Sequence, residues 1–591
     1  MKYPKIPLAQ TVVQLCKHKN IKHIVISPGS RNAPLTIGFT EDSYFKNYSI
    51  VDERCASFFA LGIAQQIQKP VAIVCTSGSA LLNYYPAVSE AFYSDIPLVV
   101  ISADRPPYSI DIGDGQTIRQ ENVFEKHILF SANLKQDIRK EEYKVLGDGK
   151  NMPKVFQNVN VFNLQEGIQK NNEHKINKAL NTAIDSRGPV HINVPFEEPL
   201  YEVTDSLSVT VKNIVSVDTS IDLTLDELTK YAHIWNTSDR KMILTGVNYP
   251  ESVDKVLLAK LASDESVIVF TETTSNIHHD NFFPGIDKII APVEYSVDKD
   301  ELFKKLQPDI LLTFGGMVVS KKIKAFLRKY KPKHHWHIDL KKAYDTYYCL
   351  EKHFKLTPND FFKKFLPIVT LQKGEYRGYW EKVKNNRREY HKKYIQKIEF
   401  SDFKAFHFIL NSIPDFYQLQ LGNSSTIRYT QLFDINPNLR VFCNRGTSGI
   451  EGSTSTAVGA SVAYKKPTIF ITGDLSFFYD SNALWNKYIR PDFRIIVVNN
   501  EGGGIFRILP GQKNSANFDT YFETVHSLDA QNLCKMYGVD YLPAHTEKDL
   551  IKHLSEFYEE SDRAKLLEVF TPRKVNDEIL IGYFKYFSEN S

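Results

Sequence analysis

Short, continuously apolar runs alternate with longer stretches of helical apolar spacing through the first 200 residues. The runs end at Gly, Pro, Ser or Asp, as strands covered on both faces of a parallel sheet commonly do. They are HIVIS (23–27), YSIVD (48–52), VAIVCT (71–76), PLVVISA (97–103) and VHINVP (190–195). Segments 53–67 and 79–93 lie between them and have helical spacing. This alternation predicts a doubly wound parallel α/β domain.

The same alternation returns twice further along the chain. Apolar runs at 241–246, 266–272, 309–316 and 334–340 predict a second sheet, and runs at 440–444, 467–474 and 493–500 predict a third. We therefore expect three doubly wound parallel-sheet domains, at 1–200, 215–370 and 385–591, with a polar linker near 201–225. The strongly basic segment 374–400 is interpreted as a solvated helix that joins two domains, with a nucleic-acid patch as the alternative.

Composition narrows the class of protein. The chain has 591 residues and a formal net charge of +4, which is too small an excess to indicate nucleic-acid binding. Its six cysteines are far apart without a CxxC pair, which argues against a disulfide framework and favours a reducing, cytoplasmic location. No apolar window approaches 18 residues and no cleavable leader is evident, so we expect no membrane span.

The sharpest chemical signal lies at the ends of two runs in the third region. Asp474 and Asn500 are 26 residues apart, which is room for one crossover helix between neighbouring parallel strands. Their side chains would then share the carboxyl edge of the sheet, where α/β folds bind ligands. Asp, Asn and a backbone carbonyl suit a Mg²⁺ ion that bridges a diphosphate, and Gly502–Gly504 would let the backbone approach phosphates. Alternatively, Gly473-Asp474 is only a helix cap, and the glycines at 502–504 are only a flexible loop.

This GD…NN pair resembles the metal and diphosphate motif of thiamine-diphosphate enzymes, although Leu475 stands where most of them have glycine. One branch shares that departure, and its other motifs are also present. They are SPGSRNAPL (27–35), DERCASFFALGIA (52–64), ADRPP (103–107), GQTIRQ (115–120), GNSSTIR (422–428) and NRGTSGIEG (444–452). Together they resemble the 2-succinyl-5-enolpyruvyl-6-hydroxy-3-cyclohexene-1-carboxylate synthase family of menaquinone biosynthesis.

The resemblance implies a function. It is the decarboxylation of 2-oxoglutarate and the addition of the resulting succinic-semialdehyde unit to isochorismate, with release of CO₂. The implied cofactors are thiamine diphosphate and Mg²⁺ or Mn²⁺, and the implied assembly is a homodimer or a dimer of dimers. The metal ligands would be Asp474, Asn500 and Gly502. The cofactor-binding residues would be Glu53, Gly473, Asp474, Leu475, Ser476, Asn500, Gly502 and, as the wedge that keeps the cofactor bent, Ile450.

Glu53 follows the run YSIVD at the start of a predicted helix. The resemblance implies that it hydrogen-bonds N1′ of the aminopyrimidine and promotes the tautomer that deprotonates C2 of the thiazolium. A carboxyl group suits this task because the proton is shared between acid and ring. The resemblance also implies that Glu53 serves cofactor held by a partner subunit. Without the resemblance, Glu53 reads as a first-turn acid favoured by the helix dipole.

The implied substrates are both dianions, and arginine offers the planar fork that binds carboxylates through two hydrogen bonds. The candidate clamps follow predicted strands or Gly-rich turns, whereas a lone arginine usually lies on the surface. They are Arg31, Arg105, Arg428 and Arg445, and the same resemblance adds Ser30, Gln116, Ser424, Ile505 and Phe506 as substrate contacts.

Several features depart from the family pattern or point elsewhere. Glu501 stands where Asn is common, Gly115 where Asn is expected, and Glu451 where Asp is common. The cluster of His334, His335 and His337 is not interpreted as a metal site, because 335 and 337 would share one face of a strand and 334 the other. Another thiamine-dependent 2-oxo acid decarboxylase or carboligase, or a non-catalytic relative, remains the alternative. No GxGxxG or GxxxxGK[ST] motif supports nucleotide chemistry.

Overall fold

The computed structural model describes residues 1–138, 161–216, 224–508, 513 and 515–590. The chain divides into two compact units. The first comprises Met1–Thr219, Thr454–Lys465 and Asp480–Ile489, and the second comprises Ser220–Ser453, Lys466–Tyr479 and Arg490–Ser591. Within the described ranges, no helix is both long enough and apolar enough to cross a membrane.

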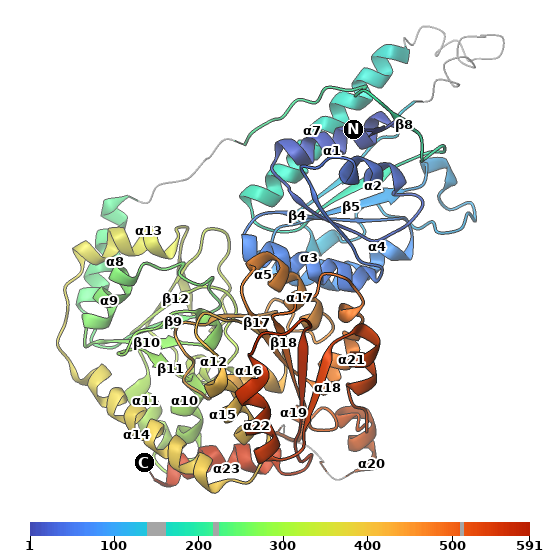
Figure 1. Ribbon diagram of the computed structural model, residues 1–591. Helices are drawn as coiled ribbons and strands as arrows, with labels where there is room; N and C mark the ends of the chain where they lie inside the picture. The colour runs from blue at the N-terminus through green and yellow to red at the C-terminus, as the bar shows by residue number, and fades with distance from the viewer. Residues whose placement is uncertain (139–160, 217–223, 509–512, 514, 591) are drawn as a thin grey trace. The chain divides into compact units, whose positions relative to one another are not determined.

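The first unit is built on a six-stranded parallel sheet with helices on both faces (Figure 1). The strand order is β3 (Lys46–Ser49), β2 (His23–Ile26), β4 (Val71–Cys75), β5 (Leu98–Asp104), β7 (Val190–Pro195) and β6 (Phe130–Asn133). One face shares an apolar core with α1 (Pro7–His18), α2 (Ala33–Thr40) and α7 (Val161–Asp185). The other carries α3 (Glu53–Ile67), α4 (Ser79–Asn83) and α5 (Tyr85–Ser94). A short antiparallel pair joins β1 (Tyr3–Pro4) to β8 (Val203–Thr204).

Two segments from later in the chain also belong to this unit, namely α17 (Ser453–Tyr464) and η5 (Ser481–Leu484). Helix α17 lies against α3 with glycines at the closest approach. A Cβ atom on Gly62 would fall 2.1 Å from the Thr456 carbonyl oxygen, and one on Gly459 would fall 2.0 Å from that of Phe59. Glycine is therefore required at both positions for these two helix backbones to meet.

The second unit contains two further six-stranded parallel sheets. The first has the order β11 (Phe283–Pro284), β10 (Val267–Thr271), β9 (Lys241–Thr245), β12 (Ile310–Phe314), β13 (His334–Ile338) and β14 (Leu350–Phe354). One of its cores includes α8 (Leu225–Asn236), α9 (Lys255–Ser263) and α13 (Pro358–Phe365). The other includes α10 (Ile286–Glu294), α11 (Lys299–Leu306), α12 (Lys321–Lys329) and α14 (Glu375–Lys397).

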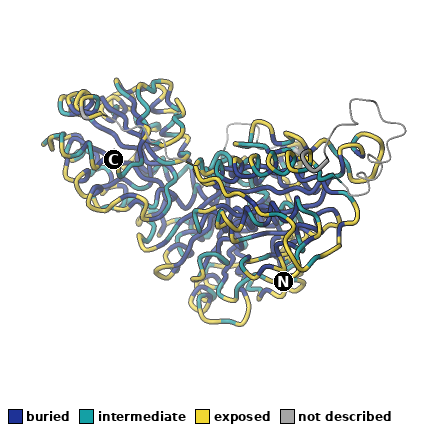
Figure 2. Tube along the Cα trace, turned by 90° about the horizontal axis from the view of Figure 1, so that it is seen from above, coloured by how far each residue is buried: buried dark blue, intermediate teal, exposed yellow. Residues whose placement is uncertain are grey.

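The last sheet has the order β16 (Arg440–Cys443), β15 (Gln418–Leu421), β17 (Thr468–Gly473), β18 (Phe493–Asn499), β20 (Lys565–Phe570) and β19 (Asp540–Ala544). Helices α15 (Asp402–Ser412), α16 (Ser425–Thr430), α22 (Glu547–Phe557) and α23 (Asn576–Glu589) share its core. Short helices connect the elements of all three sheets. They are α18 (Asp474–Tyr479), α19 (Ile505–Ile508), α20 (Ala516–Phe518), α21 (Gln531–Tyr537), η1 (Pro107–Ser109), η2 (Glu125–His127), η3 (Thr273–Ser275), η4 (Leu366–Ile368) and η6 (Asp519–Glu523). The central strands of all three sheets are buried over nearly all of their residues, and Figure 2 shows such buried segments in the interior.

The prediction of three doubly wound parallel sheets is confirmed. The domain boundaries stay a prediction, and residues 217–223 of the predicted linker lie outside the described residues. Segment 79–93 is helical, as expected, but it forms two helices, α4 and α5, with Tyr84 between them. One local prediction is wrong in part: YSIVD is strand only to Ser49, and Asp52 at its end caps α3.

Segment 374–400 is a helix, as expected, but it is not solvated all round. Tyr376 and Trp380 of α14 are buried in the core of the second sheet. Lys384 is also buried, and its Nζ donates to the carbonyls of Asp280 (2.9 Å) and Phe282 (3.2 Å). The basic residues thus include side chains that tie the helix to the sheet, because a lysine stem can pack while its ammonium group binds carbonyls.

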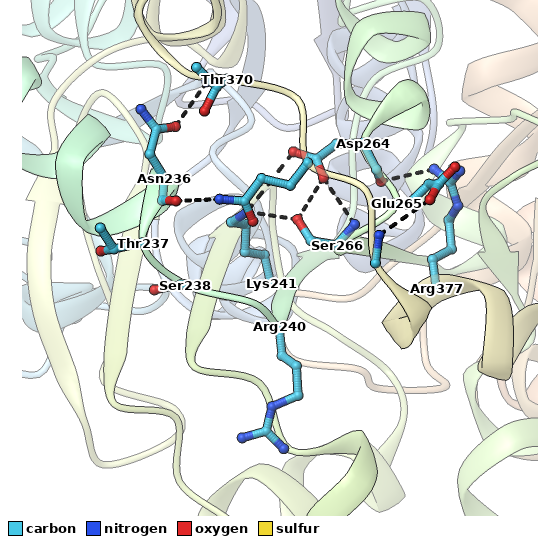
Figure 3. A network of polar contacts seen from close by, with 12 residues as sticks. Asn236, Thr237, Ser238, Arg240, Lys241, Asp264, Glu265, Ser266, Thr370 and Arg377 are labelled. Atoms are coloured by element: carbon cyan, nitrogen blue, oxygen red, sulfur yellow. Dashed lines mark hydrogen bonds and ion pairs between the residues drawn. The ribbon is translucent and has the colours of Figure 1, made fainter.

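The buried Lys241 lies at the amino end of the second sheet, within a network of polar contacts (Figure 3). The Nζ of Lys241 donates to Ser266 Oγ (2.7 Å) and Gln372 Oε1 (2.9 Å) and lies 5.3 Å from the ring centroid of Trp235. Asp264 is 4.0 Å away and accepts from the hydroxyl of Ser266 at 2.6 Å. Burial lowers the pKa of Lys241, and the nearby carboxylate of Asp264 opposes that shift. These contacts connect the start of β9, the start of β10 and the segment before α14, so they hold this end of the sheet together.

The three histidines of β13 divide between different partners. Thr313 Oγ1 lies 3.0 Å from His335 Nε2 and 2.8 Å from His337 Nδ1, so these two share a face, and His334 pairs instead with Glu351. Burial lowers the pKa of His335 and of His337 to about 4, which leaves both neutral at pH 7. Both rings therefore share Thr313 Oγ1 as a hydrogen-bond partner.

Candidate functional site

The two residues expected at the edge of the last sheet do lie together. Strands β17 and β18 are hydrogen-bonded neighbours, Asp474 follows β17, and Asn500 follows β18. The backbone N–H of Gly502 donates to Asp474 Oδ2 (2.9 Å), which joins the two strand ends directly. The crossover is not the single helix that the spacing predicts. It consists of α18 and η5, which are only six and four residues long.

Both side chains at this edge are buried and held. Asp474 is 2% exposed, and its Oδ1 accepts from the backbone N–H of Leu475 at 2.7 Å. Asn500 is 7% exposed and donates from Nδ2 to Asp402 Oδ2 at 2.8 Å. A buried carboxylate beside a buried amide is a donor set for a hard divalent cation, and the carbonyl of Gly502 would add a third oxygen.

Two further residues of this edge were not among those predicted. The Nε2 of His526 lies 3.3 Å from Asp474 Oδ2, and this interaction raises the pKa of His526. Asp402, at the start of α15, bonds to Asn500 and also to Thr571 Oγ1 (2.6 Å). Neither lies in a Gly-rich motif or at the end of a predicted strand, so the sequence offered no signal for them.

The end of β17 beside this pair is open, and the backbone of the facing loop requires glycine. A Cβ atom on Gly473 would meet no described atom within 4 Å, so the strand end faces open space. Gly502 has φ of +146°, and a Cβ there would fall 2.6 Å from the Glu523 carbonyl oxygen, so glycine is required. Ser476 Oγ donates to the carbonyl of Ile450 at 2.9 Å, which brings two further predicted cofactor residues together. In the described residues no cluster holds three or more His, Cys, Asp or Glu, so a cation here would rely on one carboxylate and neutral oxygens.

The predicted arginines form two pairs, one in each unit. In the first unit, Arg31 donates to the carbonyl of Phe196 (3.0 Å) and pairs with Glu198 (3.1 Å). Arg105 donates to the carbonyl of Gly115 at 3.1 Å. Burial lowers the pKa of Arg31, and the positive charge of Arg105 lowers it further. Two cations held within electrostatic reach of each other fit an anionic ligand.

The second pair has the same character. Arg428 Nη1 donates to the carbonyl of Ser424 (2.8 Å), and Arg445 Nη1 donates to Asn423 Oδ1 (2.7 Å). Burial lowers the pKa of Arg428, and the charge of Arg445 lowers it further. Asn423 was missed although it lies in the motif GNSSTIR. Its Nδ2 also donates to the carbonyls of Asn444 and Gly449, at 2.7 Å each, so it braces the loop that carries Arg445.

The remaining predicted substrate contacts are more exposed. Ser30 and Gln116 are exposed, and Gln116 has φ of +55°. A Cβ atom on Gly78 would fall 3.2 Å from the Gln116 carbonyl oxygen, so the two loops touch. In the second unit, Ser424 and Ile505 are half-buried and Phe506 is 37% exposed. Each unit therefore carries its own set of predicted substrate contacts.

Glu53 is the first residue of α3 and is half-buried. Asp52 caps the helix by accepting from the backbone N–H of Cys55 (3.1 Å), and Asn482 Nδ2 donates to the other oxygen of Asp52 (2.9 Å). Burial raises the pKa of the Cys75 thiol, and the charge of Glu53 raises it further, which places Glu53 near the carboxyl end of β4. The start of α3 is therefore held by hydrogen bonds to both carboxylate oxygens of Asp52.

Comparison with known proteins identifies the family of the chain. The family model for the N-terminal TPP-binding domain of thiamine pyrophosphate enzymes matches residues 6–128, and that for the C-terminal TPP-binding domain matches 422–569. Curated relatives named 2-succinyl-5-enolpyruvyl-6-hydroxy-3-cyclohexene-1-carboxylate synthase include that of Christiangramia forsetii, which is 57% identical over 99% of this chain and 100% of its own. That of Flavobacterium johnsoniae is 54% identical over the same shares, and that of Porphyromonas gingivalis is 37% identical over 98% of this chain and 97% of its own. The chain therefore belongs to the 2-succinyl-5-enolpyruvyl-6-hydroxy-3-cyclohexene-1-carboxylate synthase family of thiamine-diphosphate enzymes.

Proposed function

We propose that this protein decarboxylates 2-oxoglutarate and adds the resulting succinic-semialdehyde unit to isochorismate, yielding the product for which its relatives are named. The observation that carries this proposal is the pairing of the arginines. The Nε atoms of Arg31, Arg105 and Arg445 are buried and have no hydrogen-bond partner among the described residues. Buried guanidinium donors without partners are costly unless a ligand binds them, and a dicarboxylate supplies the matching acceptors.

The residues at the sheet edge fit the cofactor of this family. We propose that Asp474, Asn500 and the carbonyl of Gly502 hold Mg²⁺ or Mn²⁺, with the diphosphate beside Gly473, Leu475 and Ser476. When bound, thiamine diphosphate supplies a carbon nucleophile that attacks 2-oxo acids. The chain itself binds the charges, orients the substrates through its arginines and moves a proton through the carboxyl group of Glu53.

A direct assay tests the reaction. Protein, thiamine diphosphate, Mg²⁺ and 2-oxoglutarate are mixed with and without isochorismate, and CO₂ and product are measured. We expect the carboligated product only when both substrates are present. A preference for pyruvate over 2-oxoglutarate would instead identify a different 2-oxo acid decarboxylase or carboligase.

The clamp role of the arginines gives a prediction. Arg105→Lys keeps the charge but loses the planar fork, and a lost charged hydrogen bond costs roughly 1.5–3 kcal/mol. We expect kcat/KM to fall by about 10- to 150-fold, since about 1.4 kcal/mol corresponds to a factor of ten. Single-turnover decarboxylation of 2-oxoglutarate then shows which substrate Arg105 serves. The matched control is Arg119→Lys, because Arg119 lies in the same loop with a side chain that is 82% exposed. Full activity of the Arg105 variant would exclude it as a clamp.

We also propose a homodimer in which Glu53 of one copy serves cofactor bound at Asp474 of the other. This assembly makes a prediction for mixed subunits. Glu53→Gln and Asp474→Ala chains are each expected to be inactive alone. After subunit exchange, a heterodimer would contain one site with both residues intact. An equimolar mixture should therefore recover about a quarter of the wild-type activity, because half of the dimers would each carry one of two sites. Exchange proven by mass spectrometry without recovered activity would place both residues of a site on one chain.

A further inference from the structure

Asn500 can serve a cation only through its carbonyl oxygen, so the orientation of its amide decides whether it is a ligand. An amide rotated by half a turn would present Nδ2, which is a donor and repels a cation. In the structure, Nδ2 lies 2.8 Å from Asp402 Oδ2. Because a carboxylate only accepts hydrogen bonds, the NH₂ end of Asn500 must face Asp402, and the carbonyl end must face away.

Asp402 is itself held by hydrogen bonds with two residues from other parts of the last sheet's fold, Thr571 and Asn576. It is the first residue of α15 and 2% exposed. Its Oδ1 accepts from Thr571 Oγ1 (2.6 Å), just after β20, and its backbone N–H donates to Asn576 Oδ1 (2.8 Å) at the start of α23. Asn576 in turn donates to the carbonyl of Pro572 at 2.7 Å. The acceptor that meets Asn500 is therefore held in place by the rigid core of the sheet.

We infer that Asp402 is a positioning residue that locks the amide of Asn500 with its carbonyl oxygen toward the cation. This inference rests on the proposed metal site. Residues that hydrogen-bond a metal ligand commonly contribute about 10- to 100-fold to metal affinity, because they remove the ligand's wrong orientations. The sequence separates the two residues by 98 positions, so only the fold brings them together.

The test measures Mn²⁺ affinity by calorimetry in the presence of thiamine diphosphate, with no turnover required. Asp402→Leu keeps the branched shape of the side chain and removes the acceptor, and we expect Mn²⁺ affinity to fall by roughly 10- to 100-fold. Asp402→Asn removes the charge but keeps an acceptor for Asn500, because the hydroxyl of Thr571 can turn to accept from the new amide. We expect that variant to stay within a few-fold of wild type.

Further variants distinguish a failure of the role of Asp402 from a failure of the proposed metal site. Thr571→Val deletes one contact that holds Asp402 but leaves the acceptor for Asn500, so it should lower Mn²⁺ affinity less than Asp402→Leu does. Asp402→Ala replaces the leucine variant if the latter does not fold. Equal losses in Asp402→Asn and Asp402→Leu would show that charge rather than orientation matters, and unchanged affinity in Asp402→Leu would also overturn the inference. If Asn500→Ala leaves Mn²⁺ affinity unchanged, the proposed metal site itself fails, and the role of Asp402 fails with it.

Discussion

Asp474→Ala is expected to abolish Mg²⁺-dependent binding of thiamine diphosphate. Asp474 is the single carboxylate among the three proposed ligands, and the carbonyl oxygens of Asn500 and Gly502 carry no formal charge to offset a divalent cation. We expect the loss in cofactor affinity to exceed the roughly 10- to 100-fold cost of removing a group that merely supports a ligand. Calorimetric titration of thiamine diphosphate at fixed Mg²⁺ concentration measures it.

The variant also changes the loop that follows β18. Asp474 Oδ2 is the acceptor for the Gly502 N–H, so alanine leaves that N–H without its partner as well as removing the ligand. Asp529→Ala is a suitable control, because Asp529 is an exposed carboxylate of the same unit that accepts a local bond from the Gln531 N–H (2.9 Å). Unchanged cofactor affinity in Asp474→Ala, with the control also unchanged, would refute the assignment of this edge as the metal site.

The sequence predicted β17 and β18 and the residues at their ends, but it did not predict β15 and β20, which lie inside the same sheet. Buried parallel strands are continuous apolar runs, so β17 and β18 were recognisable, and their carboxyl ends placed Asp474 and Asn500 at one edge. Strands that contain polar residues could not be predicted from apolar runs. LEKHF of β14 and DYLPA of β19 lie at sheet edges and bury only some of their side chains, so they lack the apolar run that marks a strand.

Residues that act by positioning another side chain also could not be predicted from the sequence. Asp402 begins a helix, where an acidic residue is ordinary, and nothing local relates it to Asn500. Asn423 lies inside a motif that was recognised, yet its bonds to Asn444, Arg445 and Gly449 depend on how two loops meet. Pairing of Arg31 with Arg105, and of Arg428 with Arg445, likewise follows from the fold and not from spacing.

Glu53→Gln is expected to slow exchange of the C2 proton of bound thiamine diphosphate by roughly 10²- to 10⁴-fold, the usual contribution of a positioned acid or base. An amide keeps the shape of the side chain but cannot take up the proton. Helix α3 should persist, because its cap is Asp52, which is held by Asn482. Loss of one charge in the first turn costs only about 0.3–1 kcal/mol. Cofactor affinity should therefore remain close to that of wild type while exchange slows.

That contrast between retained affinity and lost exchange is what identifies a proton-transfer role. Rapid-quench exchange in deuterated water, followed by NMR of the released cofactor, measures the C2 rate without any substrate. Glu41→Gln serves as the control, because Glu41 is an exposed acid of the same unit, at the end of α2. Parallel losses of affinity and exchange in Glu53→Gln would mean that Glu53 mainly binds the cofactor. Exchange at the wild-type rate would remove Glu53 from the chemistry altogether, because a carboxyl group that promotes the tautomer which deprotonates C2 cannot be replaced by an amide without slowing that step.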